Sequence, residues 1–226
     1  MRILELFKGT GSITKWVAEN NYNVEIYSLD ILPKFKPDWC GDIMDWDYKQ
    51  FPPKHFDIIW ASPECKIFSI LQNTHIGRKW KTKEELHTEQ KKHAKFILRT
   101  LEIIDYFCPK YWYIENPLHS RIWKYIPEKY NNWIDIDYCV FGFPYKKPTR
   151  ILTNVKLPDV RCKYKGKHDF RIGMPTMTGR KDDSGGLLGR YRIPPQLISY
   201  LFQFVNVSTN PLYCTECMGS SKNGIF

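Results

Sequence analysis

The chain has 226 residues, 42% of them hydrophobic and 26% charged, and it carries a formal net charge of +10. No stretch approaches the roughly 18 apolar residues of a membrane span, which excludes a helical membrane protein, and the length suffices for a full core without disulfide or metal staples. The excess of lysine and arginine favours a polyanionic partner, nucleic acid above all, with charge for solubility alone as the alternative.

Cysteine usage and the N-terminal segment indicate the compartment. Seven cysteines, an odd number without the dense spacing of a small secreted scaffold, favour free thiols in a reducing environment. The opening "MRILELF" is too short and too quickly charged for a signal peptide. We therefore expect a soluble, intracellular monomer with no membrane partner.

Strands and helices alternate from the first residue. "MRILELF" predicts a strand, "KGTGS" a turn, and "ITKWVAEN" a helix with Ile13, Trp16 and Val17 on one face. "NVEIYSLD" predicts a second strand ending on an acid, and "WCGDIMDWD" a short third segment. "FDIIWASP" is a continuous apolar run bounded by proline, which is typical of a strand in a parallel sheet covered on both faces.

The pattern changes to a helical period over Lys83–Phe107, where Ile97, Leu101 and Ile104 recur at helical spacing. Three further strands follow, "YWYIENP", "WIDIDYCVFG" and "RILTN". Strands that alternate with helices predict an α/β fold with a mostly parallel, doubly wound sheet.

Four regions follow from this pattern. Residues 1–154 form the predicted core, and 155–189 a small irregular, basic segment. Residues 190–206, which include "PPQLISYLFQF", predict a C-terminal helix that returns to the core, and the polar residues 207–226 a flexible tail.

A glycine turn and two acids indicate an adenosyl site. Gly9 and Gly11 permit close backbone approach to a ligand, and the following helix offers its positive end. About 20 residues later, Asp30 ends the second strand, where a carboxylate accepts both ribose hydroxyls, and Asp42 is placed to meet an adenine amine. Each acid taken alone is equally well explained as a helix cap or a solvated loop residue.

Cys65 follows the fourth strand in "ASPECKIFSI". A buried, inert thiol is the common role for a cysteine, but this one stands at the carboxyl edge of the sheet, where ligands bind in this architecture. A nucleophile there needs thiolate character, which the charge of Glu64 opposes unless that side chain points away.

Glu115, in "IENP", ends the fifth strand on the same edge. A partly desolvated carboxyl group there can hold or deliver a proton near neutral pH, with Asn116 fixing its orientation. The alternative is an acid that closes the strand and caps the next helix.

Seven segments in order, "ELFKGTGS", "SLDI", "GDIMDW", "ASPECKIFS", "YIENP", "FGFPYKKPTR" and "RYRIPPQL", resemble the motifs of the DNA (cytosine-5) methyltransferases from Met1 to about Phe204. The short chain resembles the compact members found in large DNA viruses and phages. The resemblance implies a Rossmann-like, S-adenosylmethionine-dependent methyltransferase fold with a small irregular target-recognition insertion. It also implies S-adenosylhomocysteine as product, double-stranded DNA as partner, and location in a virus-infected cell.

The same resemblance implies roles for residues. Cys65 matches the nucleophile that attacks C6 of a cytosine rotated out of the duplex, and Glu115 the residue that holds N3 while C5 takes the methyl group. The positions that match the cofactor site are Phe7, Gly9, Thr10, Gly11, Asp30, Ile31, Asp42, Ile43 and Pro63.

Several positions depart from the family pattern. Glu64 replaces a proline, Lys66 a glutamine and Pro117 a valine. Lys147 takes the first of two expected arginine positions, and Arg150 stands one residue beyond the second. We expect both cations to screen the thiolate and the target phosphate, against the alternative of a solvated strand edge.

Residues 155–189 take the place of the target-recognition region, and their basic side chains suit phosphate and base-edge contacts. A soluble surface is the alternative. The predicted DNA-binding residues are Arg161, Lys163, Lys165, Lys167, Arg171, Arg180 and Lys181.

Cys162, His168, Cys214 and Cys217 form a loose set of zinc-type ligands, although free surface cysteines are the favoured interpretation and we expect no metal. Two other functions stay open. One is the same chemistry on RNA, and the other is a nucleic-acid-binding relative that lost turnover through Glu64 and the altered arginines.

Overall fold

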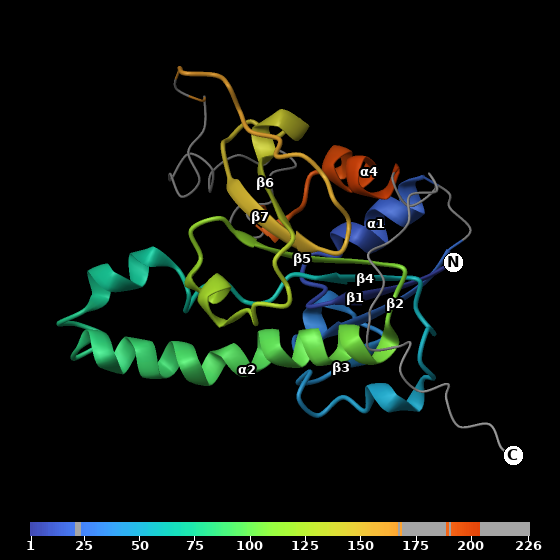
Figure 1. Cartoon of the computed structure of the whole chain (residues 1–226), viewed down its shortest axis with the longest axis horizontal. Helices are drawn as coiled ribbons and strands as arrows, with labels where there is room; N and C mark the ends of the chain where they lie inside the picture. The colour runs from blue at the N-terminus through green and yellow to red at the C-terminus, as the bar shows by residue number, and fades with distance from the viewer. Residues whose placement is uncertain (21–23, 167, 169–188, 190, 204–226) are drawn as a thin grey trace, which may run out of the picture.

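A computed structural model describes residues 1–20, 24–166, 168, 189 and 191–203. Within these residues, seven strands form one sheet in the order β3-β2-β1-β4-β5-β7-β6 (Figure 1). Strands β1 to β5 pair in parallel, while β7 pairs antiparallel with both β5 and β6. The strands are β1 Arg2–Leu6, β2 Glu25–Asp30, β3 Trp39–Cys40, β4 Ile58–Ala61, β5 Tyr111–Pro117, β6 Trp133–Asp137 and β7 Pro148–Thr153. The doubly wound, mostly parallel sheet predicted from the sequence is confirmed.

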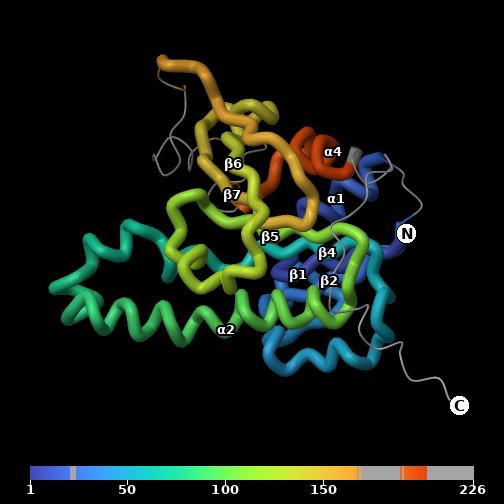
Figure 2. The backbone as a smooth tube through the Cα atoms, in the orientation of Figure 1, coloured from blue at the N-terminus to red at the C-terminus, as the bar shows by residue number. Residues whose placement is uncertain are grey.

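Helices cover both faces of the sheet. Helix α2 runs along one face, and α1 and α4 lie together on the other (Figure 1). Figure 2 shows the N-terminal half of α2 reaching past the sheet beside the segment that precedes it. The α-helices are α1 Ser12–Glu19, α2 Lys83–Phe107 and α4 Pro195–Gln203, and the 3₁₀ turns are η1 Pro33–Phe35, η2 Tyr48–Gln50, η3 Ile70–His75, η4 Arg121–Tyr125 and η5 Tyr138–Phe141. None of the described helices is both long and apolar enough to cross a membrane.

The strands are apolar at almost every position because both of their faces are buried. Alternate residues point to opposite faces. Leu4, Ile59 and Trp112 therefore belong to the core under α2, whereas Ile3, Ile58 and Tyr111 belong to the core under α1 and α4. Two buried layers explain why the strands are continuous hydrophobic runs rather than alternating ones.

The predicted elements differ from the structure mainly where strands end. The sixth strand stops at Asp137 rather than Gly142, because the chain turns into η5 and ends it with Gly142 at a positive φ of 87°. The third segment contributes only the two-residue strand β3. The helix predicted over Lys83–Phe107 has those bounds in the structure.

Helix α4 brings the C-terminal region back onto the start of the chain. The Trp16 indole Nε1 donates to Ser199 Oγ at 2.8 Å, and the Trp16 and Phe202 rings meet edge to face. This contact is part of the core under α1 and α4. The predicted tail, residues 207–226, and most of the segment 155–189 lie outside the described residues.

Candidate active site

The carboxyl ends of four neighbouring strands meet at one edge of the sheet. The register pairs Leu6 of β1 with Leu29 of β2 and Ala61 of β4, and Ala61 with Ile114 of β5. The residues that follow these positions therefore line one edge in spatial order. Parallel pairing alone brings the glycine turn, Asp30, the Cys65 loop and Glu115 together.

The turn after β1 is built on left-handed backbone. Phe7, Gly9 and Gly11 have φ values of 57°, 51° and 68°. Gly9 N donates to Asp30 Oδ2 at 2.8 Å, and Leu32 N donates to Asp30 Oδ1 at 2.8 Å. The buried carboxylate at the end of β2 thus holds the turn that the resemblance assigns to the cofactor.

Glu5 is a structural residue of this turn that the sequence reasoning missed. Its buried carboxylate accepts Ile13 N at 3.0 Å and also accepts Thr14 Oγ1, both in the first turn of α1. Burial raises the pKa of Glu5 while these hydrogen bonds lower it. The positive end of α1 therefore faces an internal acid. A lone acid within the apolar run "ILEL" was the available signal.

The remaining predicted cofactor positions come from the next strand ends. Asp42 follows β3, and its Oδ1 accepts Met44 N at 3.0 Å, while the adjacent Ile43 is buried. Ile31 is exposed just beyond β2. Thr10 lies within the glycine turn, and its Oγ1 is 3.4 Å from Ser12 Oγ. This set offers open backbone and two carboxylates, a combination that fits the ribose and adenine of an adenosyl ligand.

Cys65 lies half-buried in the loop after β4. Burial raises the pKa of its thiol, the negative charge of Glu115 raises it further, and the ammonium group of Lys147 lowers it. The pairing of Ala61 with Ile114 and the hydrogen bond from Asn116 Nδ2 to Pro63 O set the Cys65 loop beside the end of β5. Glu115 and Lys147 meet at that same strand end.

Glu115 is held by two donors on one oxygen. Tyr138 OH donates to Glu115 Oε1 at 2.9 Å, and Lys147 Nζ lies 3.3 Å from the same atom. Tyr138 is fully buried, and burial together with the charge of Glu115 raises its pKa far above the ordinary value, so it stays a donor. No sequence pattern indicated Tyr138 beyond the rule that a buried phenol hydroxyl needs a partner.

The role of Asn116 differs from the prediction that it orients Glu115. Its Nδ2 donates to Pro63 O at 2.8 Å, which ties the end of β5 to the loop that carries Cys65. The reason is strand geometry, because successive side chains point to opposite faces. Pro63, predicted at the cofactor site, is thus also the anchor of the Cys65 loop.

The two predicted catalytic cations have different partners. Lys147 contacts Glu115 and lies 4.4 Å over the Tyr138 ring. Arg150 instead forms a two-point pair with Asp135, at 2.7 and 2.9 Å, and its guanidinium lies 4.6 Å from the centre of the Trp133 ring. Lys147 therefore lies with Glu115 at the end of β5, while Arg150 braces the β6–β7 pair.

Comparison with known proteins gives one curated relative of substantial similarity, whereas no protein-family model matches the chain. A probable DNA (cytosine-5)-methyltransferase of Frog virus 3 (isolate Goorha) is 36% identical over 159 residues, which cover 69% of this chain and 72% of the relative. The chain belongs to the DNA (cytosine-5)-methyltransferase family. The resemblance found in the ordered motifs is thereby confirmed, and the relative is viral, as the short length suggested.

Solved structures of methyltransferases are also similar to this family member. The S. pombe Dnmt2 methyltransferase is 21% identical with a TM-score of 0.47, covering 74% of this chain and 52% of that one. The Entamoeba histolytica methyltransferase EhMeth is 18% identical with a TM-score of 0.46, covering 68% and 52%. The chain spans about half the length of these two proteins.

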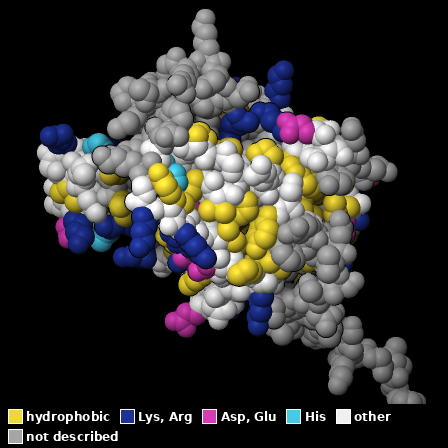
Figure 3. Space-filling view, turned by 90° about the horizontal axis from the view of Figure 1, so that it is seen from above, with side chains coloured by type: hydrophobic (Ala, Val, Ile, Leu, Met, Phe, Trp, Pro, Cys, Tyr) yellow, Lys and Arg dark blue, Asp and Glu magenta, His cyan; other side chains and the backbone are white. Residues whose placement is uncertain are grey.

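The predicted DNA contacts of this methyltransferase-family chain are only partly described. Arg161 pairs with the buried Asp137 at 3.0 Å, whereas Lys163 and Lys165 are exposed. On the face shown in Figure 3, Lys and Arg side chains lie around an area of hydrophobic side chains. Lys167, Arg171, Arg180 and Lys181 lie outside the described residues.

Proposed function

We propose that this protein, acting as a monomer, transfers a methyl group from S-adenosylmethionine to C5 of a cytosine in double-stranded DNA through a covalent Cys65 adduct. The observation that carries the proposal is the position of the Cys65 loop beside Glu115 and Lys147 at the carboxyl edge of the sheet. Membership of the family supports it, as does the name of the viral relative.

In the proposed reaction, Cys65 and Glu115 each form or break a bond at one atom of the cytosine ring. Cys65 Sγ forms a bond to C6 of the base, and the carboxyl group of Glu115 places a proton on N3, so that the ring electrons move to C5. S-adenosylmethionine, when bound, supplies the electrophilic methyl group. Loss of the C5 proton to a base then restores the C5–C6 double bond and expels Sγ as thiolate, while N3 returns its proton to Glu115.

Charge balance within the pocket explains why the thiol and the acid are paired. In the free protein the raised pKa of Cys65 favours its protonated thiol. Ionising the thiol while Glu115 gains a proton leaves the net charge of the pocket unchanged. Lys147 favours the thiolate during this exchange, and Tyr138 holds Glu115 Oε1 in one orientation.

The cofactor would be held mainly by backbone and two acids. The turn around Gly9 and Gly11 lets the ligand approach the main chain. Asp30 already accepts two backbone N–H groups, one on each oxygen, and each oxygen keeps a second lone pair for a ribose hydroxyl. Asp42 and Ile43 would meet the adenine.

The DNA contacts would offset the unstacking cost of rotating the base out of the duplex, a few kcal/mol. A net charge of +10 and the exposed Lys163 and Lys165 suit phosphate contacts. We extend this role to Arg161 and to the remaining basic residues of the segment.

Covalent trapping tests the proposal. Incubation with S-adenosylmethionine and duplex DNA containing 5-fluorocytosine should give an adduct that survives denaturation, because fluorine blocks the final elimination. Cys65→Ser should give none. Cys40→Ser is the matched control, since Cys40 is an exposed thiol at the end of β3, and it should trap as well as the unmodified protein.

A second arm with 5-fluorocytosine transfer RNA separates the substrate classes. Adducts with the duplex and none with RNA support the proposal. Adducts with RNA alone would replace DNA by RNA as substrate, and no adduct with either would leave a binding protein. Bisulfite sequencing of DNA from expressing cells then reads the target context.

A further inference from the structure

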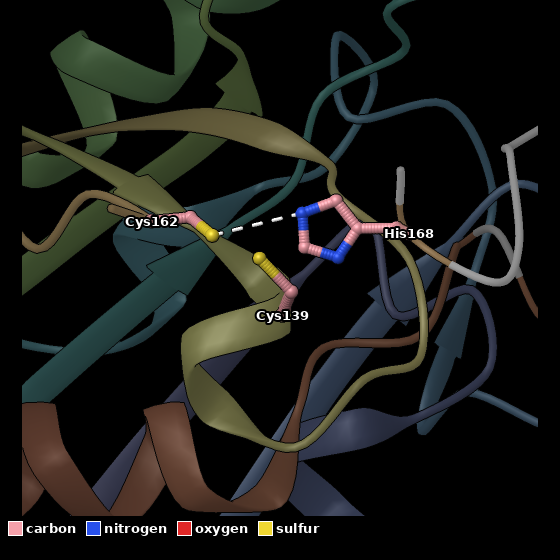
Figure 4. Close-up of side chains that lie close together, drawn as sticks. All are labelled: Cys139, Cys162 and His168. Atoms are coloured by element: carbon pink, nitrogen blue, oxygen red, sulfur yellow. Dashed lines mark hydrogen bonds between the residues drawn. The ribbon is translucent and has the colours of Figure 1, made fainter. Parts of the chain in front are cut away.

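Three metal-type ligand side chains meet away from the Cys65 pocket. Cys139 belongs to η5, and Cys162 and His168 come from the segment after β7. Their ligand atoms all lie within 4.8 Å of one another. Figure 4 shows both sulfur atoms and a nitrogen of the His168 ring turned toward a common centre.

The spacing matches a tetrahedral metal site. Cys162 Sγ lies 3.6 Å from His168 Nε2. A zinc ion with bonds of about 2.3 Å to sulfur and about 2.0–2.1 Å to nitrogen separates those two ligands by roughly 3.6 Å at the tetrahedral angle. Two thiols and an imidazole are also the donors that zinc prefers over magnesium or calcium.

The two cysteine ligands are held in place by contacts with the end of β6. Asp137 N donates to Val160 O at 3.0 Å, so the segment before Cys162 runs alongside the end of β6. The buried Asp137 Oδ2 accepts Cys162 N at 2.9 Å, and Cys139 lies only two residues after Asp137. The Tyr164 ring packs edge-on against the His168 ring, with centroids 5.5 Å apart.

We propose that Cys139, Cys162 and His168 bind one zinc ion, with a fourth position left for water or another ligand. The three residues line an open surface hollow of about 670 Å³ that also includes Phe143 and Pro144, so a fourth ligand has access from solvent. The ion would fasten the start of the basic segment to η5. Because Tyr138 precedes Cys139 and holds Glu115, the site would also brace the catalytic pocket.

This ligand set differs from the one considered from the sequence. Cys139 was absent from that set, because it lies 23 residues before Cys162 and has no CxxC partner. Cys214 and Cys217, which have the expected spacing, lie outside the described residues. The proposal rests on the three described side chains alone and does not depend on methyl transfer.

Metal analysis of the purified full chain tests the site. Protein prepared with a reductant and free of chelator, then exposed to zinc and desalted, should hold one zinc per chain. Cys139→Ser and Cys162→Ser should each reduce this content to background. Cys40→Ser and Cys65→Ser are matched single-thiol controls and should keep the metal.

Cobalt substitution provides a spectroscopic measurement of the site that does not depend on a variant losing its metal. Bound Co²⁺ should show the sulfur-to-metal absorption of two thiolates in a tetrahedral field. His168→Cys should keep the metal and shift that absorption toward the three-thiolate pattern. A shift of this kind supports the site even if a cysteine variant fails to fold.

Three results would overturn the proposal. They are zinc content at background in the unmodified protein, full zinc content in both Cys139→Ser and Cys162→Ser, or a cobalt spectrum without thiolate absorption. A Cys214→Ser/Cys217→Ser double variant that keeps its zinc would support the three-residue set. Loss of zinc in that variant while Cys139→Ser keeps it would assign the metal to the tail.

Discussion

The proposed cofactor end and the proposed catalytic end of the sheet edge are held by different kinds of contact. At the cofactor end, Glu5 binds α1 only eight residues away, and Asp30 binds a turn 21 residues away. At the catalytic end, Glu115 reaches Lys147 across 32 residues, and Asn116 reaches Pro63 across 53. The first end is organised by neighbouring sequence, and the second by strand β7 inserted between β5 and β6.

The buried acids of the two ends are neutralised differently as well. Glu5 and Asp30 are satisfied by backbone N–H groups and a hydroxyl. Glu115 and Asp137 instead face lysine or arginine side chains. We therefore expect the cofactor end to tolerate a change of charge better than the catalytic end, where each acid and its cation depend on each other.

Glu115→Gln should produce the largest effect. The amide cannot deliver a proton to N3, so methyl transfer should fall on the order of 10²- to 10⁴-fold, whereas S-adenosylmethionine binding at the other end should stay unchanged. Single-turnover transfer of a labelled methyl group and calorimetric cofactor binding measure the two effects. Glu89→Gln, on an exposed part of α2, is the control. An equal loss of cofactor binding would contradict the separation of the two ends.

Asp137→Asn should give the next largest effect, on stability. The fully buried carboxylate faces Arg161 at 3.0 Å and Lys146 at 3.6 Å, and removing its charge weakens both contacts while Arg161 keeps Asp135 at 3.9 Å. The free energy of unfolding should fall by about 2–3 kcal/mol in urea denaturation, because hydrogen bonds to a buried charged group are lost. Asp105→Asn, which weakens the partly exposed pair with Lys129 and keeps an oxygen to accept Tyr130 OH, should cost about 1 kcal/mol or less. Similar losses in both variants would show that burial of the pair is unimportant.

Gly11→Ala probes the cofactor end with a smaller effect. A side chain at a φ of 68° should cost about 1–2 kcal/mol of stability, and it should weaken S-adenosylmethionine binding about tenfold. Gly77 has a φ of 81° and open space around its Cα, so Gly77→Ala should show the stability loss alone. Cofactor binding that weakens equally in both variants would mean that the turn has no direct role.

The smallest expected effect is a pair of opposite shifts in the reactivity of Cys65. Removing the negative charge in Glu115→Gln should lower the pKa of the thiol and speed its alkylation at neutral pH. Removing the ammonium group in Lys147→Met should raise that pKa and move the alkylation profile to higher pH. Mass spectrometry of iodoacetamide labelling, with Cys40 as internal control, measures both. Shifts in the same direction would indicate general disruption rather than charge.

Local sequence determined much of this fold. Continuous apolar runs indicated the buried strands, and helical periodicity gave α2, whose start the Thr82 side chain fixes by accepting Glu85 N. Parallel strands end at the same edge of a sheet, so Cys65 and Glu115 could be placed together before any coordinates. The motif order then indicated the family.

Only the tertiary structure decided which side chains meet at the catalytic end. The antiparallel insertion of β7 brings Lys147 to Glu115 and turns Arg150 toward Asp135, and neither outcome is encoded in the local pattern. Tyr138 and Cys139 were missed for the same reason, since their partners come from distant segments. Periodicity reports which face of an element is buried, whereas the partner across that face depends on strand order and register, which are properties of the whole chain.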